Sequence, residues 1–206
     1  LEVVATEKFN IGDKDMTAQL LRAKTSGAQA ILTWGIGPEL AAIANGMAKM
    51  DMKIAFIGGW TLSMSNFIDN AGRNGNGALM PQTFIEEGLT PKATQFIDSY
   101  HQTYNVTRIP SPVSAAQGYD AVLLFAAAVE QAQSSDSRKI KTALEDLHTP
   151  VVGVIATWDH PFHPWNPEDV NTHEAFRREQ AVMGMVQDGR VVFANENDRL
   201  RLRAKM

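Results

Sequence analysis

Residues 30–40 of the chain read AILTWGIGPEL, an apolar run that leads through two glycines into a Pro-Glu pair. The run Ala30–Trp34 is short and rich in residues that favour extended backbone, so it predicts a β-strand. Pro38 suits the first turn of a helix, because the N–H that proline lacks would have no partner there, and Glu39 suits the positive end of the helix dipole. A strand that runs through glycines into a helix is the repeating unit of an α/β fold.

Strand–helix units of the same kind lie on both sides of this stretch. We expect a helix that Asp13 or Asp15 caps and that Gly27 closes. Further strands are predicted at residues 1–5, 53–57 and 78–81, and further helices from Pro38 to about Met50 and at residues 66–71. Strands that alternate with helices of this length predict a parallel sheet with right-handed crossovers.

The pattern changes after residue 82 and becomes mainly helical. Helices are predicted at residues 91–104, 113–133 and 137–147. The run 113–133 consists largely of Ala, Leu, Val and Phe, so we expect it to be buried on most sides.

Strand character returns near the C-terminus. Residues 151–158 predict one strand, and residues 159–176 predict a long polar loop rich in Pro and His. The segments 181–186 and 190–194 flank Asp188-Gly189, a strong turn signal, and predict a β-hairpin.

Composition narrows the classes of function. The 206 residues include no cysteine, which excludes disulfides and thiolate chemistry, and the net charge of −4 with scattered Lys and Arg argues against a nucleic-acid partner. The longest strongly apolar run, Ala121–Val129, is too short to span a bilayer. The sequence contains neither a P-loop, a GxGxxG fingerprint nor a nucleophile elbow, so no cofactor is expected.

Five motifs in the correct order carry a resemblance to a known family. They are GDKDMTAQL at residues 12–20, GAQAIL at 27–32, FIGG at 56–59, YDAV at 119–122 and QDGRV at 187–191. Together they resemble the type I periplasmic solute-binding proteins of ABC importers, in the branched-chain amino-acid (Leu/Ile/Val) family.

This resemblance implies an α/β, periplasmic-binding-protein-like type I fold, with a parallel sheet flanked by helices, part of a second lobe and a C-terminal β-hairpin. It also implies that the chain is a C-terminal fragment that lacks the N-terminal lobe. Residues 1–82 then form ligand-binding lobe 2 without its first strand–helix unit, 83–150 form helices of lobe 1, and 151–206 form a crossover strand, the His- and Pro-rich loop and the hairpin. The helix 113–133 would pack on the absent lobe or on a second copy of the chain.

By the same resemblance, the protein is an extracytoplasmic solute-binding component of an ABC transporter and not an enzyme. Its partners would be a small solute, the membrane permease subunits and its own N-terminal lobe, and its location would be periplasmic or lipid-anchored outside the cytoplasm. Strand ends and helix starts are where such a fold meets its ligand. The predicted ligand-binding residues are Trp34, Gly35, Ile36, Gly59, Trp60, Thr61 and Ser114.

The solute itself stays open. In amino-acid binders of the family, an aromatic ring and a carboxylate hold the ligand ammonium, and the corresponding positions here are Ile36 and Trp60. Trp60 supplies a ring but no charge. An aromatic or aliphatic carboxylate, or an amide, is therefore as plausible as an α-amino acid.

Each of these residues also has a purely structural interpretation. Trp34 and Trp60 could be core side chains, Ile36 could staple the helix that follows, and Ser114 could be a helix cap. Glu39 is better explained as a partner of the helix dipole than as a ligand group.

Two other functions remain as alternatives. The same fold serves as a ligand-sensing receptor module. The loop containing His160, His163 and His173 could instead belong to a metal-dependent hydrolase, although Pro161 breaks the spacing of a helical metal pair.

Overall fold

The computed structural model describes residues 1–203, except for the side chains of Val170 and residues 201–203. The chain forms two compact units. The sheet unit comprises residues 1–87, 110–112 and 182–200. The helical unit comprises residues 88–109 and 113–181, together with residues 201–203.

The sheet unit contains one five-stranded sheet in the order β1-β2-β3-β6-β7. Its strands are β1 (Ala30–Thr33), β2 (Ala55–Gly58), β3 (Leu79–Gln82), β6 (Val182–Gln187) and β7 (Arg190–Phe193). Its helices are α1 (Thr17–Thr25), α2 (Gly37–Lys49) and α3 (Ser65–Ala71), with 3₁₀ turns at Trp60–Ser63 and Gly72–Gly75, and α7 (Glu196–Arg203) begins in this unit.

The parallel sheet expected from the strand–helix units is confirmed for β1, β2 and β3, and the expected C-terminal hairpin joins the same sheet. β1, β2 and β3 run parallel, whereas β6 runs antiparallel to β3 and β7 antiparallel to β6. The turn at Asp188-Gly189, where both residues have positive φ, reverses the chain so tightly that β7 must run antiparallel to its neighbour. The sheet is therefore mixed.

The strand expected at residues 1–5 is absent. This segment is exposed and has no strand assignment. A strand needs a neighbour to receive its backbone hydrogen bonds, and β1 is an edge strand of the described sheet whose one partner is β2.

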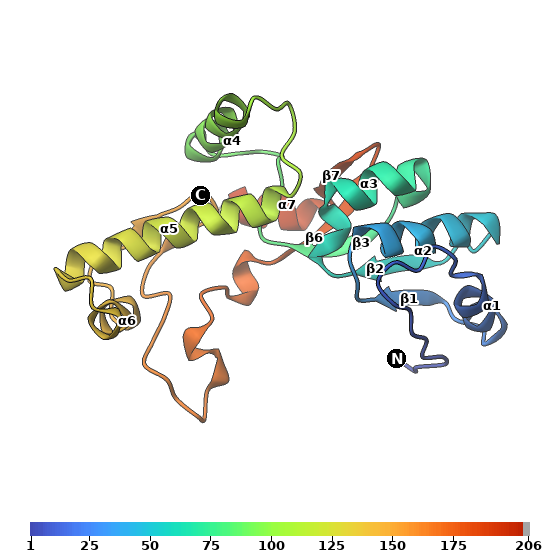
Figure 1. Ribbon diagram of the computed structural model, residues 1–206, viewed down its shortest axis with the longest axis horizontal. Coiled ribbons are helices and arrows are strands. Elements are labelled where there is room, and N and C mark those ends of the chain that lie inside the picture. The colour runs from blue at the N-terminus through green and yellow to red at the C-terminus, as the bar shows by residue number, and fades with distance from the viewer. Residues whose placement is uncertain (204–206) are drawn as a thin grey trace. The chain divides into compact units, whose positions relative to one another are not determined.

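The core of the sheet unit lies between the sheet and the helices α2 and α3. In Figure 1 these two helices run over the strands next to each other, and they pack closely together. The buried stripe of α2 includes Leu40, Ile43, Ala44 and Met47, which recur at helical spacing and meet Phe67 and Ile68 of α3 in one cluster. The cluster fixes where the start of α2 lies relative to the strand ends.

The helical unit is built from three helices and a short hairpin. Its elements are α4 (Pro91–Tyr104), α5 (Pro112–Ala132), α6 (Ser137–Glu145), β4 (Val151–Val152) and β5 (Thr157–Trp158), with 3₁₀ turns at Val170–His173 and Arg178–Gln180. Thr90 accepts a hydrogen bond from the Ala93 N–H at the start of α4, and Asp136 caps α6 in the same way.

The single strand expected at residues 151–158 is a tight hairpin instead. β4 pairs antiparallel with β5, and the turn between them is held by a buried carboxylate. Asp120 of α5 accepts hydrogen bonds from the Val154 N–H at 2.7 Å, the Ile155 N–H at 3.0 Å and the Trp158 indole N–H at 2.9 Å. A Cβ at Gly153 would lie 2.2 Å from Asp120 Oδ2, so only glycine leaves room for this clasp.

The helix α5 is less buried than its composition suggests. Leu124 and Ala128 face the core of the helical unit, but Tyr119, Val122 and Phe125 are exposed. The spacing of these three residues places them on one helix face, so the expectation of burial on most sides is wrong for that face.

The expectation that the apolar run Ala121–Val129 is too short to span a bilayer considered only part of α5. Over its 21 residues, α5 is long and apolar enough to cross a bilayer by length and composition. Its buried Asp120 is committed to the β4–β5 hairpin, however, which identifies α5 as the central helix of a folded unit.

Replacing Asp120 tests the clasp. Asp120→Ala leaves three buried or half-buried N–H donors without their acceptor, so we expect the free energy of unfolding to fall by about 3 kcal/mol. Urea denaturation followed by far-UV circular dichroism measures the change. The matched control is Asp98→Ala, an exposed carboxylate on α4, which should change stability by less than about 0.5 kcal/mol. Equal effects of the two variants would contradict the role given to Asp120.

Candidate functional site

Two loops of the sheet unit meet where the parallel strands β1 and β2 end. β1 and β2 pair in parallel with Thr33 opposite Gly58, so both strands end at the same level. Residues 34–36 follow β1, and residues 59–61 follow β2. We call these six residues the strand-end site. They comprise all of the predicted ligand-binding residues except Ser114.

A hydrogen bond and a ring contact tie the two loops together. The Thr61 hydroxyl donates to the Gly35 carbonyl oxygen at 2.7 Å. A Cβ at Gly59 would lie 3.7 Å from Cε2 of Trp34, so the indole ring of Trp34 lies directly beside the Gly59 backbone. The two loops therefore form one surface.

The side chains of this surface face solvent. Trp34 is 77% exposed, Ile36 is 48% exposed and Trp60 is 44% exposed. The interpretation of the two tryptophans as core residues is therefore wrong. Large apolar side chains that gather at the ends of parallel strands are available to a ligand.

A buried and a partly buried side chain pack against the loops and hold them in place. Leu62 is fully buried, and a Cβ at Gly58 would lie 2.6 Å from its Cδ1. On the other loop, a Cβ at Gly35 would lie 2.9 Å from Cζ of Phe9. The sequence did not reveal this supporting role of Phe9, because the residue lies in a segment without regular structure and far from Gly35 along the chain.

Glu39 belongs to the scaffold of the site. Its side chain is 3% exposed, and Oε1 accepts a hydrogen bond from the Gly12 N–H at 2.7 Å. The bond joins the first turn of α2 to the segment that leads into α1. This agrees with the structural interpretation of Glu39, whose carboxylate also lies at the positive end of the α2 dipole.

Ser114 is placed in the other unit. It lies in the first turns of α5 and is half-buried. Its part in ligand binding stays a prediction.

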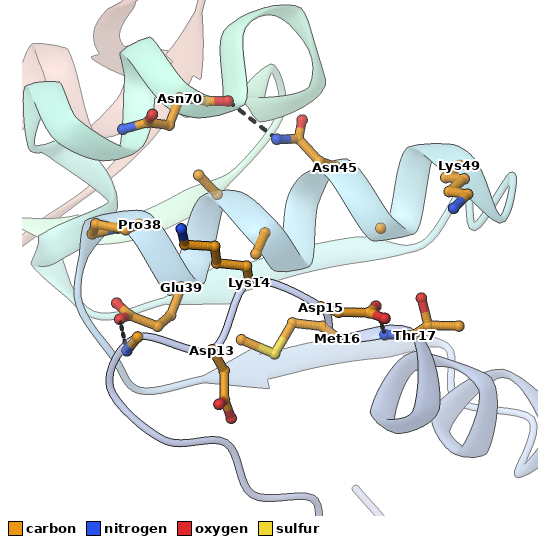
Figure 2. A pocket seen from close by; sticks show the side chains of 14 residues that line it. Asp13, Lys14, Asp15, Met16, Thr17, Pro38, Glu39, Asn45, Lys49 and Asn70 are labelled. Atoms are coloured by element: carbon orange, nitrogen blue, oxygen red, sulfur yellow. Dashed lines mark hydrogen bonds between the residues drawn. The ribbon is translucent and has the colours of Figure 1, made fainter.

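A separate cavity of about 580 Å³ lies along the outer side of α2. Figure 2 shows that it is bordered by the segment 13–17 and by side chains of α2, among them Glu39, Asn45 and Lys49. It shares no residue with the strand-end site. The lining of this cavity carries charges of both signs, from Asp13, Lys14, Asp15 and Lys49. Such a mixed lining is typical of a solvated surface groove.

The His-rich loop does not assemble a metal site in the described part of the chain. His160 Nδ1 lies 2.8 Å from an oxygen of Asp159, and His173 Nε2 lies 2.9 Å from Glu145 Oε1. Glu145 also accepts from Lys141 Nζ at 2.5 Å, and the two hydrogen bonds, that of Lys141 foremost, lower the pKa of Glu145. Among residues 1–203, no three His, Asp or Glu side chains come together as ligands.

A sheet whose parallel strands end in exposed, glycine-containing loops beside a helix start defines a class: an α/β ligand-binding lobe. The family model described as "Periplasmic binding protein" matches residues 1–172. The chain belongs to this family, and the resemblance given by the five sequence motifs is confirmed.

Relatives of known name fit the same family. The chain is 25% identical over 183 residues to the leucine-, isoleucine-, valine-, threonine- and alanine-binding protein of Pseudomonas aeruginosa, covering 84% of this chain and 48% of that protein. It is 27% identical over 136 residues to the Leu/Ile/Val-binding protein homologue 3 of Brucella melitensis, covering 66% of this chain and 36% of that protein. The chain thus spans half or less of the length of these curated relatives.

Solved structures agree on the type I fold. The leucine-binding protein LivK of Thermotoga maritima superposes with a TM-score of 0.74 at 24% identity, covering 92% of this chain and 51% of that one. LivJ of Streptococcus pneumoniae, a branched-chain amino-acid transporter substrate-binding protein solved with isoleucine, superposes with a TM-score of 0.68 at 26% identity, covering 89% and 48%.

The hydrogen bond between the two loops can be tested directly. Thr61→Val removes the hydroxyl at nearly constant volume and leaves the half-buried Gly35 carbonyl without its donor, so we expect a loss of about 1 kcal/mol in stability. Thr61→Ser, the matched control, keeps the hydroxyl and should recover most of the loss. Thermal unfolding of both variants measures it. If serine and valine prove equally destabilising, the hydroxyl does not join the loops.

Proposed function

We propose that this chain forms part of the solute-binding component of an ABC importer, which captures a small amino-acid-like or carboxylate solute between two lobes. The observation that carries the proposal is the strand-end site: two joined loops that expose Trp34, Ile36 and Trp60 at the edge where parallel α/β sheets bind ligands. Family membership supports it, and the relatives named above are solute-binding proteins rather than enzymes.

The sheet unit would be the ligand-binding lobe, and the helical unit would belong to the other lobe. The chain passes between its two units near residues 87–88, 109–113 and 181–182, and such connections are where a hinge would act. Closure around the solute would give the form that docks on the permease subunits in the membrane. A periplasmic binding protein family supports an extracytoplasmic location, either free in the periplasm or lipid-anchored.

The second surface, which would close over the solute from the other side, would come from the part of the relatives' length that this chain does not span. Two features of the chain support this assignment. The outer edge of β1 is unpaired in the described sheet, with Leu32 73% exposed, and the face of α5 that carries Val122 and Phe125 is exposed. Both are surfaces of the kind that a missing strand or lobe covers.

A receptor module of the same fold remains the second candidate, because a sensor would use the same strand-end site. The gene context decides between the two: fusion to a membrane segment or a signalling domain would favour the sensor. A metal-dependent hydrolase is not favoured, since His160 and His173 each pair with a different carboxylate. Elemental analysis for zinc tests that alternative.

Ligand-dependent melting tests the two-lobe proposal. The product of the complete gene should be stabilised by a bound solute from a panel of amino acids and carboxylates, by about 2.7 kcal/mol when the solute is at a hundred times its Kd. The 206-residue chain alone should be stabilised far less, because it would contact the solute from one side only. Differential scanning fluorimetry compares the two proteins. Strong stabilisation of the 206-residue chain by itself would contradict the need for a second lobe.

A further inference from the structure

The strand-end site offers two aromatic rings and no charge. The segments 33–37 and 58–63 contain no Asp, Glu, Lys, Arg or His. The surface that they form is made of the Trp34 and Trp60 rings, the Ile36 side chain and the backbone of glycines. An ammonium group on a ligand would find no carboxylate in either loop.

The carboxylate next in sequence has one oxygen engaged elsewhere and its other oxygen buried. Glu39 is buried, its Oε1 accepts from the Gly12 N–H, and its side chain lines the separate cavity along α2, as Figure 2 shows. Turning Glu39 toward a ligand would break that bond and leave the Gly12 N–H without its acceptor. Neither the two loops nor Glu39 in this arrangement therefore supplies a counter-charge to an ammonium at this site.

The Trp34 ring packs beside the second loop, the Trp60 backbone is held by hydrogen bonds, and both rings are exposed. Trp34 lies beside the Gly59 backbone, and its Cε2 is 3.7 Å from where a Cβ on residue 59 would lie, which is van der Waals contact. The Trp60 carbonyl oxygen accepts from the Ser63 hydroxyl at 2.7 Å and from Gln82 Nε2 at 3.4 Å, and both donors belong to buried residues. A loop whose backbone is ordered in advance loses little entropy when a ligand binds to it.

We propose that the solute of this protein carries a planar aromatic ring and no ammonium group, and that the ring stacks on the indoles of Trp34 and Trp60. This deepens the proposed function and rests on it. A flat ring suits the two exposed indole faces, because stacked aromatic pairs attract each other beyond the gain from the area that they bury. An aliphatic amino acid gains none of this and leaves its ammonium unpaired at these loops.

The test uses the product of the complete gene and isothermal titration calorimetry. The ring-bearing probes are benzoate, phenylacetate and indole-3-acetate, and the comparison probes are leucine, valine and glycine betaine. At least one ring-bearing probe should bind more tightly than every comparison probe. Trp34→Ala and Trp60→Ala should each weaken that binding at least tenfold, whereas Trp60→Phe, which keeps a ring, should weaken it less.

The matched control is Trp165→Ala. Trp165 is exposed to a similar degree but lies in the His-rich loop of the helical unit, so its removal should leave binding unchanged. Far-UV circular dichroism establishes that each variant is folded.

The outcomes separate the two proposals. Tight binding of leucine or valine that survives both alanine substitutions overturns the aromatic solute and leaves solute capture standing. Preferred binding of glycine betaine also overturns it, because the rings would then hold a quaternary ammonium by cation–π attraction. Failure of every probe to bind overturns the aromatic solute, and if a broad metabolite panel fails as well, solute capture falls with it.

Discussion

The in-register parallel pairing of β1 with β2 is the constraint on which the candidate site depends. Four consecutive residue pairs, from Ala30 opposite Ala55 to Thr33 opposite Gly58, bring the ends of the two strands to one level. The loops that follow are then close enough for the Thr61 hydroxyl to reach the Gly35 carbonyl. A shift of one residue in this register would turn the buried face of β2 outward and separate the two tryptophans from their common surface.

The helical unit depends on a comparable single group. The carboxylate of Asp120 gathers two backbone N–H groups and one indole N–H, and so converts residues 151–158 into a hairpin fixed to α5. Burial of a carboxylate is costly unless donors surround it, and Gly153 makes the close approach possible. The hairpin and α6 complete the core on one side of α5, and the opposite side stays exposed.

Each unit has a core of its own, yet each leaves some apolar surface exposed. The sheet unit has its own core of α2, α3 and the strands, so the strand-end site is formed without help from elsewhere. The tryptophans are exposed because they lie beyond the last residue that the core covers. The proposed capture of a solute between two lobes would use this exposed surface.

The sequence by itself determined most of the elements and the family. Apolar periodicity and turn residues predicted α4 with its observed ends, β1 and α2 within a residue or so, and the β6–β7 hairpin around Asp188-Gly189. The five motifs were enough to recognise the periplasmic binding protein family, because each is a short pattern of neighbouring residues.

Only the tertiary structure decided the features that depend on distant neighbours. No local signal shows that residues 1–5 lack a pairing strand or that β6 joins the sheet antiparallel. Nor does one show that Asp120 folds residues 151–158 into a hairpin through hydrogen bonds to residues at least 34 positions along the chain. The same holds for the exposure of Trp34 and Trp60 and for the burial of Glu39. The composition of a segment indicates which of its surfaces are apolar. Whether such a surface is buried depends on which other segments pack against it in the folded structure.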